Sequence, residues 1–294
     1  MNSSYFLPNS PDFQDLPWDH HLITWPALCS RLEEVQRGPS RHPVVFVNYS
    51  GILYAIKELP PGLAQQEFEL LSRIEQARLP CVSPTGYSER DTPHGRSSYL
   101  FTRYLDGSLP YRSLFMRSSL DRYRNYLLDA MAGLLVQLHL AGVFWGDCSL
   151  SNTLFRRDAG ALQAYLVDAE TAEIHPAHLS PVLRHHDLEI MLNNIEGDLV
   201  DLEASGHLPP DFPVCETGEH IMARYRSLWE EISREQVINP DEHYHIQERI
   251  RALNALGFSV RDVEIRNSEQ GGMLHLRFFI TDRNFHRDQL LGLT

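Results

Sequence analysis

The chain has 294 residues, of which 43% are hydrophobic and 22% are charged, and this composition is typical of a globular protein rather than a disordered one. Its formal net charge is −13, from 26 basic and 39 acidic residues. Binding to nucleic acid or to an anionic membrane needs a basic surface, so the charge argues against both. We therefore expect no nucleic-acid partner.

The sequence also indicates where the protein resides. No apolar run approaches the roughly 20 residues that a membrane-spanning helix needs, so we expect no integral membrane segment. Residues 1–26 lack the basic region and apolar core of a secretory signal. Cys29, Cys81, Cys148 and Cys215 lie far apart and form no Cys-x-x-Cys motif, which favours free thiols in a reducing compartment. These features predict a cytoplasmic protein.

The first elements of the chain are an arm and a hairpin. Residues 1–30 are rich in Pro and Trp, and we expect an extended arm that packs its aromatic side chains on the body. A short helix is predicted over residues 25–35. Two β-like runs follow, at 44–47 and 52–57, and the Ser50-Gly51 pair between them is typical of a β-hairpin.

Later segments alternate between helical and β-like patterns. Apolar residues at helical spacing predict helices over residues 65–79, 121–140, 181–206, 218–238 and 241–256. Short apolar runs predict strands at residues 82–87, 98–105, 143–144, 153–155, 164–167, 260–265 and 273–281. The Pro-rich stretch 209–213 is the best candidate for a linker.

Five polar residues that could take part in catalysis occur in a characteristic order along the chain. Lys57 ends an apolar strand, and Glu67 lies early in the helix that follows. Asp147 and Asn152 come after a long apolar helix, separated by four residues, and Asp168 ends the next apolar strand. Each type of residue needed for phosphoryl transfer is therefore present.

Phosphoryl transfer from ATP needs a cation on the phosphates, oxygen ligands for Mg²⁺ and an acid at the attacking hydroxyl. We expect Lys57 to contact the α- and β-phosphates and Glu67 to orient it through an ion pair. Asp147 would position or deprotonate the acceptor, and Asn152 and Asp168 would coordinate the metal. ATP and Mg²⁺ are thus the predicted cofactors.

Several neighbouring residues allow two interpretations. Glu69 lies almost opposite Glu67 on the helix, so only one of them can reach Lys57, and the apolar stripe favours Glu67. Glu170 is either a third metal ligand or a solvated turn residue. Asp187 either braces the backbone of the loop that carries Asp147 or is an acid near a helix N-terminus.

Other polar groups have simpler explanations. The acidic run 189–203 either forms a solvated helix face or lines a pocket for a cationic acceptor. The paired histidines fit surface or core positions better than metal sites, because no Cys or carboxylate lies at ligand spacing; they are His20-His21, His185-His186 and His243/His245.

The Asp-x-x-x-x-Asn spacing, followed by a strand that ends in Asp168, resembles the protein-kinase-like superfamily. Within it, the chain is most similar to bacterial lipopolysaccharide-kinase-like proteins of a domain-of-unknown-function family that has a helical C-terminal domain. The similarity extends over most of the chain, and it includes the Leu-Pro-Trp at 16–18 and the segment 249–258. Family members continue beyond the Leu-Gly-Leu-Thr end of this sequence, so we expect a shortened chain.

The resemblance implies an α+β, two-lobed kinase-like fold with a small α/β C-terminal extension. The predicted parts are the arm at 1–30, the N-lobe at 31–105, the C-lobe at 106–210 and the C-terminal domain at 211–294. Arg103, Tyr104 and Leu105 would form the hinge whose backbone meets adenine. Gly38 and Ser40 are the candidates for the phosphate-binding loop.

Three departures from the family pattern bear on activity. Trp145 stands where the family has a His, Ala169-Glu170 follow Asp168 in place of Phe-Gly, and the Gly-rich loop is poor. An acid at the position of Glu170 also occurs in small-molecule kinases of the choline and aminoglycoside type. No activation segment is recognisable, so a small-molecule or lipid-linked acceptor fits better than a protein substrate.

Three hypotheses about function remain open at this stage. The first is an active ATP- and Mg²⁺-dependent phosphotransferase. The second is a pseudokinase or nucleotide-binding regulatory module, in which the C-terminal domain would bind a protein partner. The third is a helical adaptor whose kinase-like signature is coincidental. Because function resides in the site and not in the fold, fold resemblance cannot choose between the first two.

Overall fold

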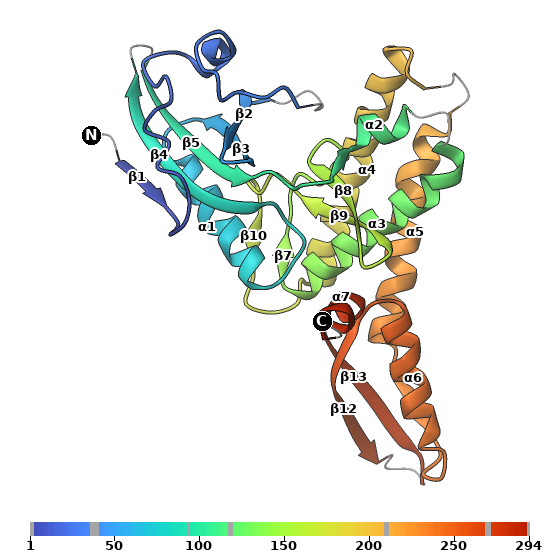
Figure 1. Ribbon diagram of the computed structural model, residues 1–294. Helices are drawn as coiled ribbons and strands as arrows, with labels where there is room; N and C mark the ends of the chain where they lie inside the picture. Colours follow the sequence, from blue (N-terminus) through green and yellow to red (C-terminus); the bar gives the residue numbers. More distant parts are fainter. Residues whose placement is uncertain are drawn as a thin grey trace.

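The computed structural model describes residues 3–35, 41–92, 95–116, 120–208, 212–267 and 272–292. It has the expected α+β architecture, with two lobes and an extension that projects from the larger lobe (Figure 1). Residues 209–211 of the predicted linker lie outside the described residues. The boundaries proposed at 105/106 and 210/211 stay predictions.

The N-lobe is built on one antiparallel sheet of five strands in the order β1-β4-β5-β3-β2. The strands are β1 (Ser3–Phe6), β2 (Val44–Tyr49), β3 (Ile52–Leu59), β4 (Ser83–Thr92) and β5 (Gly95–Arg103). The predicted hairpin joins β2 to β3. Ser50 and Gly51 both have positive φ, 55° and 83°, which is the backbone twist that two-residue hairpins require.

Helix α1 (Leu63–Gln76) covers one face of this sheet (Figure 1). Phe68, Leu71 and Ile74 form its buried stripe, as the helical spacing predicts. The same stripe carries Glu67 inward, where its side chain is only 1% exposed. A carboxylate at such a position needs a partner, because burial of an unpaired charge is costly.

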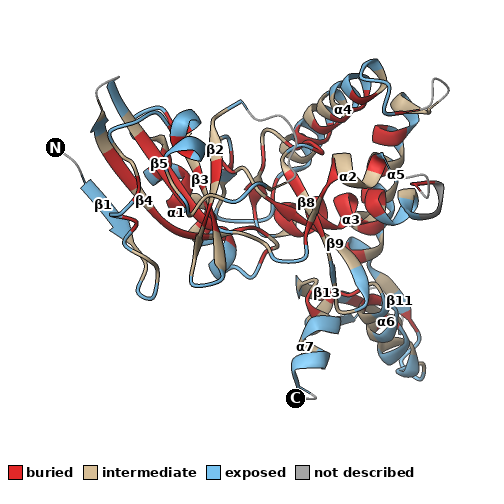
Figure 2. Cartoon of the chain, turned by 45° about the horizontal axis from the view of Figure 1, so that its top comes forward, coloured by how far each residue is buried: buried red, intermediate tan, exposed pale blue. Residues whose placement is uncertain are grey.

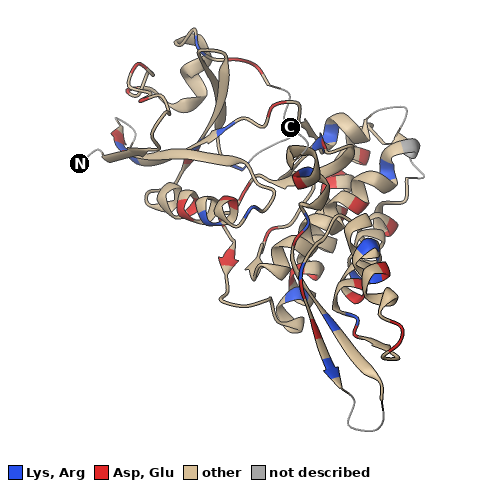
Figure 3. Ribbon diagram, turned by 60° about the horizontal axis from the view of Figure 1, so that its bottom comes forward, with Lys and Arg blue, Asp and Glu red and all other residues tan. Residues whose placement is uncertain are grey.

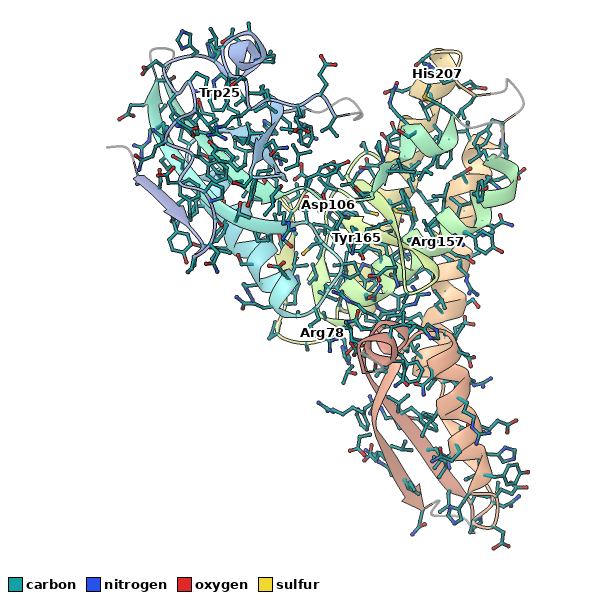
Figure 4. The ribbon with its side chains drawn as sticks, viewed as in Figure 1. Trp25, Arg78, Asp106, Arg157, Tyr165 and His207 are labelled. Atoms are coloured by element: carbon teal, nitrogen blue, oxygen red, sulfur yellow. The ribbon has the colours of Figure 1, made fainter. Side chains whose placement is uncertain are left out.

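The N-terminal arm packs its aromatic residues on the outer side of the sheet. Phe13, Leu22 and Trp25 are fully buried in a cluster with Ile56 and Phe101. Figure 4 labels Trp25 on this arm. The helix predicted over residues 25–35 is wrong. A short 3-10 helix, η1 (Leu22–Ala27), contains Pro26, and the chain then extends so that Leu32 bridges to Val47. Proline removes a backbone donor, which prevents a longer helix here.

The C-lobe is mainly helical. Its long helices are α3 (Leu120–Leu140), α4 (Pro181–Ala204) and α5 (Val214–Ser233), with the short α2 (Tyr111–Phe115) beside them. α5 packs against both α3 and α4. Figure 2 shows buried residues concentrated where these helices and the central strands meet. Short strands carry the loops of the site: β6 (Leu109–Pro110), β7 (Val143–Phe144), β8 (Thr153–Asp158), β9 (Ala161–Leu166) and β10 (Glu173–Ile174).

Gly142 ends α3 and lets the chain turn directly into β7. Its φ is +78°, and a Cβ at this position would overlap the carbonyl oxygens of Ala177 and His175. Only glycine adopts this conformation without strain at such a close approach. The turn therefore fixes where the loop that carries Asp147 begins.

The C-terminal module, defined here as residues 236–292, follows α5. It contains β11 (Gln236–Ile238), α6 (Tyr244–Ala255), β12 (Ser259–Asn267), β13 (Leu274–Asp282) and α7 (Phe285–Gly292). The helix predicted over 218–238 is thus too long at its C-terminal end, because residues 236–238 pair with β13 as an edge strand. In the view of Figure 3, acidic residues are interspersed with basic ones along the helices and the module.

Candidate active site

A cavity of about 510 Å³ lies between the two lobes. β2 and β3 form its upper wall, the segment 102–105 its back, and α4 and the loop 145–152 its floor. Lys57, Asp147, Asn152, Asp168 and Glu170 all line it. Residues that are far apart in the sequence are therefore gathered around one space.

Lys57 is the centre of a buried charge cluster. Its Nζ donates to Glu67 Oε2 at 3.0 Å and to Asp168 Oδ2 at 2.7 Å. The second oxygen of Glu67 accepts from the backbone N–H of Ala169 at 3.2 Å. Glu69 instead accepts from Gln65 on the exposed face of α1. The side chain that reaches Lys57 is therefore that of Glu67, and it also ties α1 to the end of β9.

Electrostatics in this cluster follow from burial. Burial opposes the charge on Lys57, but Glu67 and Asp168 outweigh it and raise the pKa of Lys57. Burial, reinforced by the charge of Asp168, raises the pKa of Glu67 to about 7. Burial also acts on Asp168, yet the ion pair with Lys57 lowers the pKa of this carboxyl. Lys57 and Asp168 are thus a charged pair at neutral pH.

Lys57 also stands out in the composition of the chain. It is the only lysine among the 26 basic residues, and the other 25 are arginines. An ammonium is a compact point charge that moves readily between oxygen partners, whereas a guanidinium is a rigid planar fork. The single lysine thus lies where a phosphate-binding site would need an ammonium that can move between carboxylate and phosphate oxygens.

Two amides hold Asp147. Asn152 Nδ2 donates to Asp147 Oδ2 at 3.0 Å and to the carbonyl oxygen of Asp147 at 3.1 Å. From α4, Asn194 Nδ2 donates to Asp147 Oδ1 at 2.9 Å. Both oxygens of the carboxylate are therefore oriented, and its side chain remains 30% exposed to the cavity.

Asp187 of α4 holds the backbone of the loop that carries Asp147. Asp187 Oδ2 accepts the N–H of Trp145 and Asp187 Oδ1 that of Gly146, both at 2.9 Å. Asp187 is fully buried, and His139 Nε2 lies 3.0 Å from its Oδ2. Of the two interpretations of Asp187, the brace of the loop is the one observed. The ring of His139 in turn contacts the Tyr225 hydroxyl, with 2.7 Å between Nδ1 and the oxygen.

Trp145 occupies the position where a histidine was expected from the family. It is fully buried, and its indole Nε1 donates to the carbonyl oxygen of Asp168 at 2.9 Å. A hydrogen bond therefore connects this loop to Asp168, which follows β9 by two residues instead of ending the strand as expected from the sequence. Although Trp145 replaces the expected histidine, its side chain still links the loop that carries Asp147 to Asp168.

Glu170 points into the cavity rather than away from it. Its Oε2 lies 3.2 Å from His42 Nε2 and 3.7 Å from Lys57 Nζ. Arg41, next to His42, places Nη2 3.8 Å from Asp147 Oδ2. The segment just before β2 thus meets the acids of the floor.

The residues predicted to contact adenine and the phosphates are only partly among the described residues. Arg103, Tyr104 and Leu105 line the back of the cavity, and their role as a hinge that meets adenine stays a prediction. The N–H of Tyr104 already donates to the carbonyl of Leu53 at 2.8 Å, so it cannot also serve adenine. Gly38 and Ser40, the predicted phosphate loop, lie outside the described residues.

Sequence reasoning missed Asn194, Arg41 and His42. Asn194 follows Asp187 by seven residues, and this spacing returns a helix to the same face. That periodicity could have identified it. Arg41 and His42 had no such signal, because their role depends on how the N-lobe sits over the floor.

The described residues bear on metal binding and on membrane insertion. Within the described ranges, no three His, Cys, Asp or Glu side chains are grouped so as to hold a metal ion by themselves. In the same part of the chain, no helix has the combination of length and apolar character that crossing a bilayer requires.

Comparisons with known proteins place the chain. Residues 227–294 match a Domain of unknown function (DUF4032) model. Among solved structures, it is similar to "WaaP in complex with acyl carrier protein" (TM-score 0.46, 17% identity, covering 80% of this chain and 91% of that one). It is also similar to "Crystal structure of aminoglycoside-3'-phosphotransferase of type VIII" (TM-score 0.48, 16% identity, covering 72% and 93%). No curated protein matches its sequence significantly.

The decisive match is to a family model. Residues 53–205, just over half of the chain, match the Lipopolysaccharide kinase (Kdo/WaaP) family. The matched range begins in β3, four residues before Lys57, and ends just after α4, so it contains the charge cluster, the loop 145–152 and Asp187. The chain belongs to the lipopolysaccharide kinase (Kdo/WaaP) family.

Proposed function

We propose that the protein is an ATP- and Mg²⁺-dependent phosphotransferase that acts on a small-molecule or lipid-linked acceptor. The observation that carries the proposal is the cluster of Lys57 with Glu67 and Asp168, facing Asp147 and Asn152 across one cavity. Phosphoryl transfer depends on positioning and on charge, and these five side chains supply both.

The side chains present fit a magnesium ion shared with a nucleotide. Mg²⁺ takes one or two carboxylates and completes its shell with phosphate oxygens and water, so it needs no cage of three acids. The amide nitrogen of Asn152 is engaged by Asp147, which leaves its Oδ1 to face a metal. Asp168 and Asn152 would hold the ion, with Glu170 as a further ligand, and the ion would neutralise phosphate charge.

The other residues would act as follows. Lys57 would exchange Asp168 for the α- and β-phosphates while Glu67 keeps it in place. The backbone of residues 103–105 would meet adenine. Asp147 would accept the proton of the acceptor hydroxyl or orient it. We also propose, from the sequence, a cytoplasmic location and a protein partner for the C-terminal module.

The single lysine makes a direct test available. An acyl-phosphate analogue of ATP acylates an amine that lies beside bound phosphates. We expect it to modify Lys57, with Mg²⁺-ATP competing, as measured by peptide mass spectrometry. Asp168→Asn should weaken this competition at least tenfold, since the metal would lose its main ligand. Labelling of the N-terminal amine alone, with or without ATP, would contradict nucleotide binding at this site.

Turnover separates the enzyme from a binding-only pseudokinase. An active enzyme releases ADP from Mg²⁺-ATP, and Lys57→Met and Asp147→Asn abolish the release. A pseudokinase binds the same nucleotide and shows no release above that of the two variants.

A further inference from the structure

The orientation of Asp147 depends on an α4 residue that is outside the loop motif. Asn194 Nδ2 donates to Asp147 Oδ1 at 2.9 Å and to the carbonyl oxygen of Cys148 at 3.3 Å. Asn152 Nδ2 holds the other oxygen, Oδ2, at 3.0 Å. The carboxylate is therefore gripped from two sides by two different elements.

The identity of the donating atom is fixed by its partners. An ionised carboxylate has no hydrogen to donate, so Asp147 Oδ1 can only accept hydrogen bonds. The same is true of the carbonyl oxygen of Cys148. If the amide of Asn194 were turned over, its oxygen would face two other oxygens. The amide nitrogen must therefore point at Asp147, and an aspartate of the same shape could not replace it.

α4 supports the whole loop along one of its faces. Asp187 bonds the N–H groups of Trp145 and Gly146, Asn194 bonds Asp147 and Cys148, and Asp198 accepts the N–H of Ser151 at 3.0 Å. The three α4 residues are spaced by seven and by four, which places them on one helix face. The loop is thus held at its beginning, its centre and its end.

We propose that Asn194 is a positioning residue that sets the orientation of the Asp147 carboxylate for the acceptor hydroxyl. The proposal rests on the function proposed above. A carboxylate free to rotate about its last bond would present its oxygens to the hydroxyl for only part of the time, and small misplacements of reacting groups lower rates strongly. Asn194 removes this freedom through its bond to Asp147 Oδ1 from the side of α4.

The test uses substitutions that separate hydrogen bonding from shape. Asn194→Ala removes the donor and the bulk, whereas Asn194→Asp keeps the bulk but opposes an oxygen to Asp147. For the full chain with Mg²⁺-ATP and water as acceptor, we expect kcat to fall about tenfold in Asn194→Ala and further in Asn194→Asp. The KM for ATP should change less than about threefold in Asn194→Ala, because Asp147 acts on the acceptor side.

Asn267→Asp is the matched control, since it adds the same charge at an exposed position of β12, away from the residues that line the cavity. No described hydrogen bond joins Asn267 to Asp147, so the kcat of this variant should stay within about twofold. A residue that only fills space would show the opposite order, with Asn194→Asp closer to the wild type than Asn194→Ala. That order, or equal kcat in all three proteins, would overturn the proposal.

A crystal structure of Asn194→Ala gives a readout that does not need turnover. We expect the Asp147 carboxylate to be rotated or to occupy two orientations, with Asn152 still on one oxygen. An unchanged, single orientation would overturn the positioning role. If the wild type neither binds nor turns over ATP, the proposed function fails, and the structure alone then decides whether Asn194 orients Asp147.

Discussion

Lys57 and its partners show how one side chain links three elements. The ammonium joins β3 to α1 through Glu67 and to the segment just after β9 through Asp168. Glu67 is only 1% exposed, and its hydrogen-bond partners, Lys57 and the backbone N–H of Ala169, lie inside the protein. Its place in the site is to hold Lys57 between the lobes.

Glu67→Gln tests this role at the scale of one atom pair. The neutral amide keeps the shape but cannot hold the ammonium by charge, so Lys57 should stay on Asp168 and leave the phosphates. We expect the Kd for Mg²⁺-ATP, measured by calorimetry, to rise about tenfold. The free energy of unfolding should change by less than about 1 kcal/mol, because Lys57 keeps Asp168 as its partner and no unpaired charge is left buried.

Glu69→Gln is the control for Glu67→Gln. It lies on the same helix but faces solvent and bonds Gln65. Equal nucleotide affinity in both variants would contradict the role of Glu67.

At this scale, local sequence predicted some site residues and could not predict others. Lys57 lies in β3, two residues before its end, and Asp147, Asn152 and Asp168 occupy loops next to apolar elements; all four line one cavity. Glu67 could be chosen over Glu69 from the apolar stripe alone. Arg41 and His42 could not, because their contacts with Asp147 and Glu170 cross between the lobes.

Among the elements, α3, α4 and α5 meet at a buried polar network. His139 of α3 lies between Asp187 of α4 and Tyr225 of α5. Asp187 can only accept, so His139 Nε2–H donates to it, and Nδ1 accepts from the Tyr225 hydroxyl. Burial lowers the pKa of His139, although Asp187 acts in the opposite sense, so the ring is neutral in the folded protein.

This network predicts how stability depends on pH. The ordinary pKa of histidine is 6.5, and folding depresses that of His139. Below pH 6.5 the unfolded chain therefore binds a proton that the folded chain does not. Stability from this residue is present above pH 6.5 and is lost as the pH falls through the lower, folded value. The loss can reach about 1.4 kcal/mol per pH unit for one proton.

Chemical denaturation between pH 7 and 5 measures the slope. We expect His139→Gln to give a flatter dependence than the wild type, by up to one proton. His207, exposed after α4, is the matched control, and His207→Gln should retain the wild-type slope (Figure 4). A wild-type slope in His139→Gln would contradict the neutral buried ring.

Most elements followed from periodicity, and the errors have physical causes. The helix expected over residues 25–35 was prevented by Pro26 and by the bridge from Leu32 to β2. Residues 236–238 continue a helical pattern in sequence but are taken up as an edge strand beside β13. In both cases a partner distant in sequence decided the local structure.

At the scale of the molecule, the C-terminal module touches both lobes. Asn284, which is 8% exposed, donates to the carbonyl oxygen of Arg78 at 3.2 Å. Arg78, labelled in Figure 4, lies just after α1. Arg78 also pairs with Asp288 of α7. On the other side, Arg283 packs against Gly133 of α3. The module therefore bridges the helix that carries Glu67 and the core of the C-lobe.

Asn284→Ala tests this bridge. Removing the buried donor leaves the Arg78 carbonyl without it, and we expect the free energy of unfolding to fall by about 1–2 kcal/mol in urea titrations. Asn267→Ala, at an exposed position of β12, should change it by less than about 0.5 kcal/mol. Equal stability of the two variants would show that the module rests on the lobes without support from this contact.

The central claim is that Lys57, Asn152 and Asp168 bind a metal–nucleotide complex in front of Asp147. A crystal structure with Mg²⁺ and a nonhydrolysable ATP analogue tests it most directly. We predict Lys57 Nζ on the α- and β-phosphates with Glu67 still bonded to it, and Mg²⁺ on Asn152 Oδ1 and Asp168. A nucleotide bound elsewhere, or one bound here with Lys57 still on Asp168 and no metal between Asn152 and Asp168, would contradict the account.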